Sequence, residues 1–129
     1  MSAGVLPELV LEVTPTLIVS TAIATRDFYR VHHDRDFAVA SGSKDIFLNI
    51  LTTTGLVQRY VTDWAGPEAI VRSISIRLGA PCYAGDTLTL SGQVTEADNG
   101  DQVIAVTGAC SLGNHVTGTV RLAPAGGPA

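Results

Sequence analysis

The stretch DIFLNILTTTGLVQRYVTDW, residues 45–64, decides how this chain is predicted to fold. It is the one long segment in which apolar residues recur with a helical period, and the pair Gly66-Pro67 is expected to end it. Asp45 is of the residue type that often caps a helix N-terminus, so we predict a helix over residues 45–64. A helix that is apolar on nearly all sides has to be buried on nearly all sides.

β-Strands are predicted on both sides of this helix. Beyond it the apolar period changes to two, and four strands are expected, at residues 69–78, 87–97, 102–112 and 115–122. The turn Asp98-Asn99-Gly100-Asp101 would join the second and third of them, and Gly113-Asn114 the third and fourth. Residues 9–24 are rich in Val, Ile, Leu and Thr and predict one or two further strands, with Pro15 as an interruption.

The order of these elements predicts an α+β fold. A strand region, a polar segment over 25–44 with a short helical turn at 37–40, the long helix and four antiparallel strands follow one another. The simplest cover for the helix is one antiparallel sheet that curves around it, with a second subunit covering the remainder. The 129 residues are expected to form a single domain, with loose residues 1–8 and a disordered tail over about 123–129.

Composition narrows the classes of function. Hydrophobic residues make up 46% of the chain and charged residues 16%, a balance that favours burial against a partner. The net charge of -4, without a basic stripe, argues against nucleic-acid binding. With no run of 18 apolar residues and no signal peptide, we expect no membrane span and a cytoplasmic location. Cys82 and Cys110 are expected to be buried thiols, and no ligand spacing predicts a metal site.

Asp27 and His32 lie five positions apart in the polar segment. A carboxylate and an imidazole that reach the same water molecule can deprotonate it and return a proton to the product. From the residues alone, Asp27 could equally cap a loop, and His32 and His33 could lie at the surface. Asp34 is expected to cap a short turn, and His115 to have no functional role.

Two motifs resemble those of the MaoC-like enoyl-CoA hydratases. In the first, that family has an Asp, a His five residues later, an acidic residue two further on and an aromatic-Ala pair, which correspond here to Asp27, His32, Asp34 and Phe37-Ala38. In the second, a small residue precedes Gly-Asp-Thr-Leu, as in residues 84–88. The similarity covers roughly residues 17–122 and implies the hotdog fold, a curved antiparallel sheet wrapped around one long helix.

The resemblance implies a reaction, the hydration of a trans-2-enoyl-CoA to an (R)-3-hydroxyacyl-CoA. His32 would be the base that deprotonates water, Asp27 would hold the same water, and backbone amides at the helix start would face the thioester oxygen. The family usually has Asn-Pro before the His and His-Gly at the helix start, where this chain has Tyr29-Arg30-Val31 and Leu48-Asn49-Ile50. Asn49, Ile50 and Tyr29 are therefore the candidate substrate-binding residues. No cofactor is implied, because coenzyme A is part of the substrate.

Within the family, residues 42–47, 49–51 and 55–64 resemble the small, motif-bearing subunit of two-subunit hydratases of actinobacterial steroid side-chain degradation. The resemblance implies an acyl-CoA substrate with a steroid-derived acyl group. It also implies a second MaoC-like hotdog subunit, in a heterodimer or an α2β2 heterotetramer, that supplies much of the groove for the thioester.

Three other functions are compatible with parts of the sequence. A hotdog thioesterase would need a carboxylate on or near the long helix, and Asp45 and Asp63 lie only at its predicted ends. A non-catalytic subunit would complete the fold of another chain, but the pair Asp27 and His32 argues against that role. A small cone-shaped α+β ketosteroid isomerase usually begins with helices, whereas this chain is predicted to begin with strands.

Overall fold

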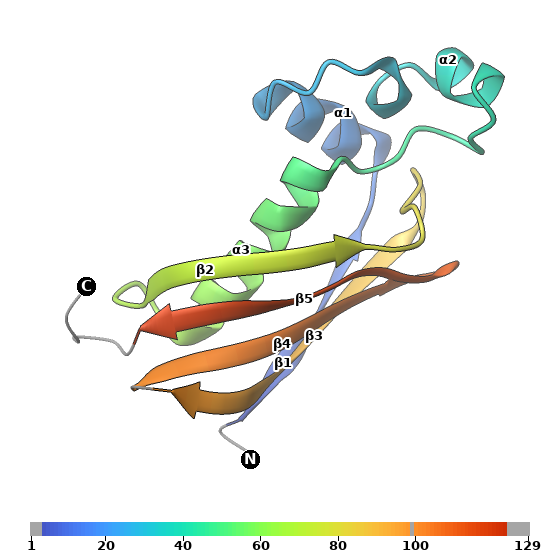
Figure 1. The fold of residues 1–129 in the computed structure, drawn as a ribbon. Coiled ribbons are helices and arrows are strands. Elements are labelled where there is room, and N and C mark those ends of the chain that lie inside the picture. Colours follow the sequence, from blue (N-terminus) through green and yellow to red (C-terminus); the bar gives the residue numbers. More distant parts are fainter. Residues whose placement is uncertain (1–3, 99, 124–129) are drawn as a thin grey trace.

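Five antiparallel strands form one sheet in the computed structural model, which describes residues 4–98 and 100–123 (Figure 1). The strand order is β1-β3-β4-β5-β2, so the first strand of the chain lies at one edge and the second at the other. The strands are β1 (Val5–Glu12), β2 (Ile70–Leu78), β3 (Thr87–Asp98), β4 (Asp101–Cys110) and β5 (Gly113–Ala123). The predicted α+β architecture, a curved sheet around a helix, is confirmed.

The long helix α3 (Ile50–Ala65) packs against one face of this sheet. Its buried residues Val57 and Val61 join the core formed with Leu88, Leu90 and Ile104 of the sheet, and Thr53 is buried beside them. Ile50 and Leu51 are about half exposed. The sheet therefore covers one face of the helix, and the opposite face, which includes Gly55, Gln58 and Arg59, is exposed. The expectation that the helix is buried on nearly all sides is wrong for this chain by itself.

The predicted start of this helix is wrong by five residues. The N-cap is Asn49, whose side-chain oxygen accepts a hydrogen bond from the Thr52 N–H at 3.3 Å. Asp45 instead accepts from the N–H of its neighbour Ile46 at 2.7 Å. The chain before Asn49 is held in extended form, because Phe47 forms an isolated β-bridge with Tyr83. Gly66, at φ 98°, ends the helix as predicted.

The N-terminal part differs most from the prediction. Residues 5–8, expected to be loose, belong to β1, and residues 15–24, expected to be strand, form the helix α1 (Pro15–Ala24). Thr14 caps this helix, since its hydroxyl oxygen accepts from the Leu17 N–H at 3.0 Å. Pro15 opens the helix rather than interrupting a strand, because a helix does not need the N–H of its first residue.

The remaining elements are close to those predicted. The polar segment contains a single 3-10 turn, η1 (Arg30–His32), and the short helix α2 (Arg35–Ala40). The turn after Asp98 is confirmed, since Asp98 pairs with Asp101. The next turn comes two residues earlier than predicted, because Cys110 pairs with Gly113 across Ser111 and Leu112. Of the predicted disordered tail, Ala123 ends β5 and residues 124–129 lie outside the described residues.

The helices α1 and α2 gather beyond one end of the sheet, above the N-terminal turn of α3 (Figure 1). The polar segment between them therefore lies beside this turn of α3. Among residues 4–98 and 100–123, no helix has the length and apolar character needed to cross a membrane.

Candidate active site

Asp27 and His32 face each other across a short gap. The Nε2 atom of His32 lies 3.6 Å from Oδ2 of Asp27, and the His32 side chain is only 10% exposed. At 3.6 Å the two atoms are too far apart for a direct hydrogen bond, and a small molecule such as water could contact both. The structure thus brings together the two residues for which the sequence predicts a catalytic role.

A backbone contact fixes the tautomer of the His32 ring. Nδ1 lies 2.8 Å from the carbonyl oxygen of Phe47, and the two rings make an edge contact at 4.8 Å between centroids. A carbonyl only accepts hydrogen bonds, so Nδ1 carries the hydrogen in the neutral ring. Nε2 then presents a lone pair toward Asp27, as a general base requires.

The loop after α1 holds the Asp27 carboxylate. Arg26 takes a left-handed conformation at φ 59°, and the Asp27 N–H donates to the carbonyl of Ala22 at 2.9 Å. One carboxylate oxygen, Oδ1, accepts from the Tyr29 N–H at 3.3 Å. The loop-cap interpretation of Asp27 is therefore correct for Oδ1, while Oδ2 faces His32.

Asn49 connects this loop to α3. Its Nδ2 donates to Oδ2 of Asp27 at 3.1 Å and to Oγ1 of Thr25 at 2.9 Å. Asn49 is buried, at 2% exposure. The carboxylate, the imidazole and the N-terminus of the long helix consequently form one site.

Large exposed side chains surround the site. Tyr29 contacts the His32 ring edge-on at 6.1 Å between centroids, yet it is 60% exposed. Phe28, Ile50 and Leu51 are also more than half exposed. Of these residues, Tyr29 and Ile50 are among those predicted to bind substrate, whereas Phe28 and Leu51 are exposed neighbours that the sequence did not single out. Their exposure depends on how the loop lies over α3, and sequence periodicity carries no information about that.

Comparison with known proteins identifies the family of this chain. The family model described as MaoC like domain matches residues 3–115. The 3-oxo-4,17-pregnadiene-20-carboxyl-CoA hydratase beta subunit of Mycobacterium tuberculosis is 66% identical over 119 residues, which make up 92% of each chain. The chain belongs to the MaoC-like domain family.

Solved structures share the fold of this MaoC-like chain. A chain of the ChsH1-ChsH2 complex from Mycobacterium tuberculosis superposes with a TM-score of 0.92 at 63% identity, covering 96% of this chain and 99% of that one. The (R)-hydratase from A. caviae involved in PHA biosynthesis superposes with a TM-score of 0.86 at 18% identity, covering 96% and 97%. The second likeness shows the fold alone. The predicted hotdog fold is confirmed.

Other residues of the first motif shape the loop of the MaoC-like chain. Asp34 caps α2, because its side chain accepts from the Phe37 N–H at 3.1 Å. It also pairs with Arg30 at 3.0 Å. The Phe37 N–H and the Arg30 guanidinium together lower the pKa of Asp34. His33 is exposed and contacts the Phe28 carbonyl at 3.1 Å through Nε2. Asp34 is thus the turn cap that was predicted.

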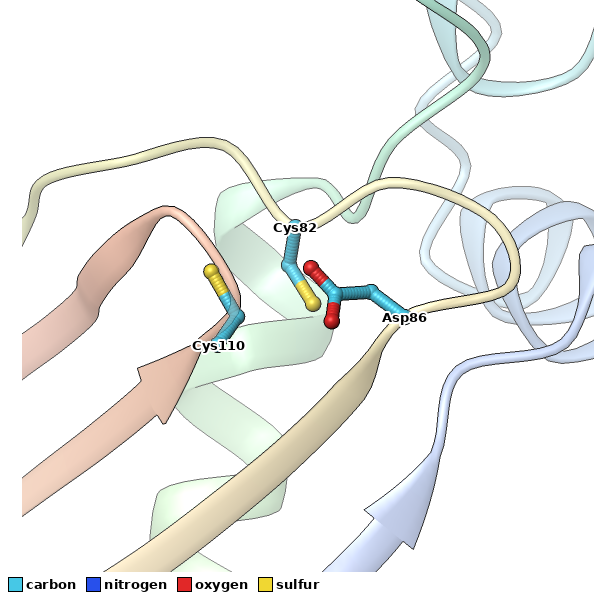
Figure 2. Close-up of side chains that lie close together, drawn as sticks. All are labelled: Cys82, Asp86 and Cys110. Carbon is cyan, nitrogen blue, oxygen red and sulfur yellow. The ribbon is translucent and has the colours of Figure 1, made fainter.

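The second motif forms a corner between strands (Figure 2). One oxygen of Asp86 accepts from the Thr87 N–H and the other from the Ser111 hydroxyl, both at 2.7 Å. Ligand atoms of Cys82 and Asp86, in the connection between β2 and β3, and of Cys110, at the end of β4, lie within 4.8 Å of one another, a grouping that spacing along the sequence could not predict. Both cysteines are unpaired thiols; Cys82 is buried, as predicted, and Cys110 is half-buried. Burial raises the pKa of the Cys82 thiol to about 12.

Proposed function

We propose that this chain is the catalytic subunit of an enoyl-CoA hydratase, which adds water to a trans-2-enoyl-CoA to form a 3-hydroxyacyl-CoA. The observation that carries the proposal is the 3.6 Å approach of His32 Nε2 to Asp27 Oδ2 beside the N-terminus of α3. The hydratase named above, at 66% identity, supports the same reaction class.

The dyad activates water. A water molecule between the two side chains gives a proton to Nε2 of His32, while Oδ2 of Asp27 accepts its other hydrogen. The water oxygen then forms a bond to C3 of the enoyl group, and the electron pair of the C2–C3 double bond moves toward the thioester carbonyl. A proton from the dyad reaches C2, which restores the carbonyl and completes the addition without a net change of oxidation state.

Charge on the thioester oxygen is stabilised by backbone amides at the start of α3. The N–H of Thr52 is bound by the Asn49 side chain, and the N–H of Thr53 by the Asn49 carbonyl at 3.1 Å. Among the contacts of the described residues, the N–H groups of Asn49, Ile50 and Leu51 have no acceptor. These three amides, at the positive end of the helix dipole, are the donors we assign to the thioester oxygen.

The acyl-CoA groove is completed by a second MaoC-like hotdog chain, in a heterodimer or an α2β2 heterotetramer. Exposed apolar side chains beside the dyad, among them Phe28, Tyr29 and Ile50, support this arrangement. The ChsH1-ChsH2 complex, one chain of which is 63% identical to this one, supports a partner of the same kind. The substrate is a steroid side-chain acyl-CoA, a class that the name of the hydratase relative supports. The cytoplasmic location expected from the sequence remains a prediction.

The test is turnover by the complex that co-purifies with this chain from its own cells. A second hotdog chain is expected in the complex, and a steroid side-chain enoyl-CoA should give the 3-hydroxyacyl-CoA by mass spectrometry. Release of free CoA without the hydroxy product would instead indicate a thioesterase. The structure offers little for that activity, because Asp45 precedes α3 and Asp63 is exposed near its end.

A further inference from the structure

The Asn49 side chain makes hydrogen bonds to three different elements. Its Nδ2 donates to Thr25 at the end of α1 and to Asp27 in the loop, at 2.9 Å and 3.1 Å. Its Oδ1 accepts from the Thr52 N–H in the first turn of α3. These partners also determine which end of the amide is nitrogen, because a carboxylate can only accept and a backbone N–H can only donate.

The contact to Asp27 involves the oxygen on which the proposed reaction depends. Oδ2 of Asp27 is the atom nearest to His32 Nε2, and it is also the atom that receives the Asn49 hydrogen bond. The other oxygen, Oδ1, is engaged by the Tyr29 N–H. The two contacts together fix the rotation of the carboxylate, and among residues 4–98 and 100–123 the Asn49 contact is the one that links it to α3.

We infer that Asn49 is a positioning residue for the hydration proposed above, on which this inference rests. Its side-chain Nδ2 holds Asp27 Oδ2 toward the water shared with His32. Its side-chain Oδ1 holds the first turn of α3, where the backbone N–H groups assigned above to the thioester oxygen are located. One side chain therefore fixes the position of the water relative to the N–H groups that bind the thioester oxygen. Misplacing either group by about 1 Å can cost on the order of 100-fold in rate.

A simple N-cap is the alternative role for Asn49. Capping uses only the Oδ1 atom, whereas positioning of Asp27 uses only the Nδ2 atom. Asn49→Asp separates the two roles, because aspartate has the same shape and is an equally good N-cap but cannot donate to Asp27. It also places a second carboxylate beside the first, and two adjacent negative charges are unfavourable.

The experiment compares Asn49→Asp with Thr14→Ala in the co-purified complex. Thr14→Ala removes the same kind of cap from α1, away from the site, so it should lower the midpoint of urea unfolding and leave kcat within about twofold. Asn49→Asp should also lower the midpoint, because it buries a second carboxylate beside Asp27, but unlike Thr14→Ala it should lower kcat by about 10- to 100-fold with little change in KM. The acidic limb of its kcat/KM profile should move to higher pH, which a purely structural role would not cause.

The outcomes separate this inference from the proposed function. If the wild-type complex hydrates the enoyl-CoA, Asp27→Ala abolishes turnover, and Asn49→Asp keeps both kcat and the pH profile, then Asn49 is only a cap and the inference is wrong. If Asp27→Ala itself turns over normally, the proposed function fails, and the inference fails with it. Asn49→Ala, which loses both atoms, should lower both the unfolding midpoint and kcat.

Discussion

Thr53 of α3 and His115 of β5 are bound to each other inside the core, with 2.8 Å between Oγ1 and Nε2. The other ring nitrogen of His115, Nδ1, lies 2.8 Å from the carbonyl of Ala80. Since the carbonyl only accepts, Nδ1 carries the hydrogen and the Thr53 hydroxyl donates to Nε2. His115 therefore holds the long helix against the sheet, and its burial in the core disfavours the charged form of the ring.

Acid should lower the free energy of unfolding, because protonation would place a charge on the buried His115 ring. Burial lowers the pKa of His115 below its usual value near 6.5, although the Ala80 contact opposes the shift. Because the unfolded chain binds the proton more readily, the His115 contribution is complete above about pH 6.5 and is lost as the pH falls below that value. The free energy of unfolding in urea, measured between pH 7.5 and 5.5, should fall by at most ~1.4 kcal/mol per pH unit from this group.

A matched pair of variants isolates that effect. His115→Gln should reduce the slope of unfolding free energy against pH. His33→Gln is the matched control for the same substitution at an exposed position. An equal slope in wild type and His115→Gln would show that the acid sensitivity arises elsewhere.

Adjacent threonines of α3 should respond with opposite sign to the same substitution. The Thr52 hydroxyl is buried and has no hydrogen-bond partner among the residues described by the structure. Thr52→Val should therefore raise the free energy of unfolding by about 1 kcal/mol, because an unpaired polar group leaves the core. Thr53→Val should lower it by about 1–3 kcal/mol, because Nε2 of His115 loses its donor. Urea unfolding at pH 7.5 measures both, and a destabilised Thr52→Val protein would contradict this interpretation.

The two neighbouring histidines of the loop should differ in their effect on turnover. His32→Ala removes the proposed base and should lower kcat by about 10²- to 10⁴-fold. His33→Ala removes an exposed ring that contacts the Phe28 carbonyl and does not approach Asp27, so kcat should stay within a few-fold of wild type. Steady-state hydration by the assembled complex measures both. Near-normal turnover by the His32 variant would place catalysis in the partner chain.

The two thiols should react at different rates. Cys82 is buried with its pKa raised to about 12, so almost none of it is thiolate at pH 8. Cys110 is half-buried, and its Sγ lies 3.7 Å from the Pro81 carbonyl. Iodoacetamide at pH 8 should label Cys110 first and Cys82 only after unfolding in urea, as judged by peptide mass spectrometry. Equal labelling in the native protein would show that the corner around Asp86 opens readily.

Local sequence patterns could not locate the start of α3, because two residues were suitable as its N-cap. Both Asp45 and Asn49 are good N-cap residues, and the helical period of the stretch includes both. The choice is made by residues far along the chain, because Phe47 pairs with Tyr83 and the Leu48 N–H donates to the Cys82 carbonyl at 3.1 Å. These contacts keep residues before 49 extended.

Strand propensity misled the prediction over residues 15–24. Val, Ile and Thr favour strands only weakly, and tertiary packing overrides that preference. Ile18 and Ala22, four positions apart on one side of α1, are fully buried in the fold. The pair Thr14-Pro15 is the local pattern that could have predicted the helix, as an N-cap followed by proline.

The amino-acid sequence by itself determined the long apolar helix, the period-two strands and the Asp–His spacing, because each depends on neighbours along the chain. Tertiary structure alone decided which distant groups meet: Asn49 with Asp27, 22 positions away, and Thr53 with His115, 62 positions away. Such contacts depend on how the helices pack on the sheet, and that packing is the sum of many apolar contacts rather than of any local preference.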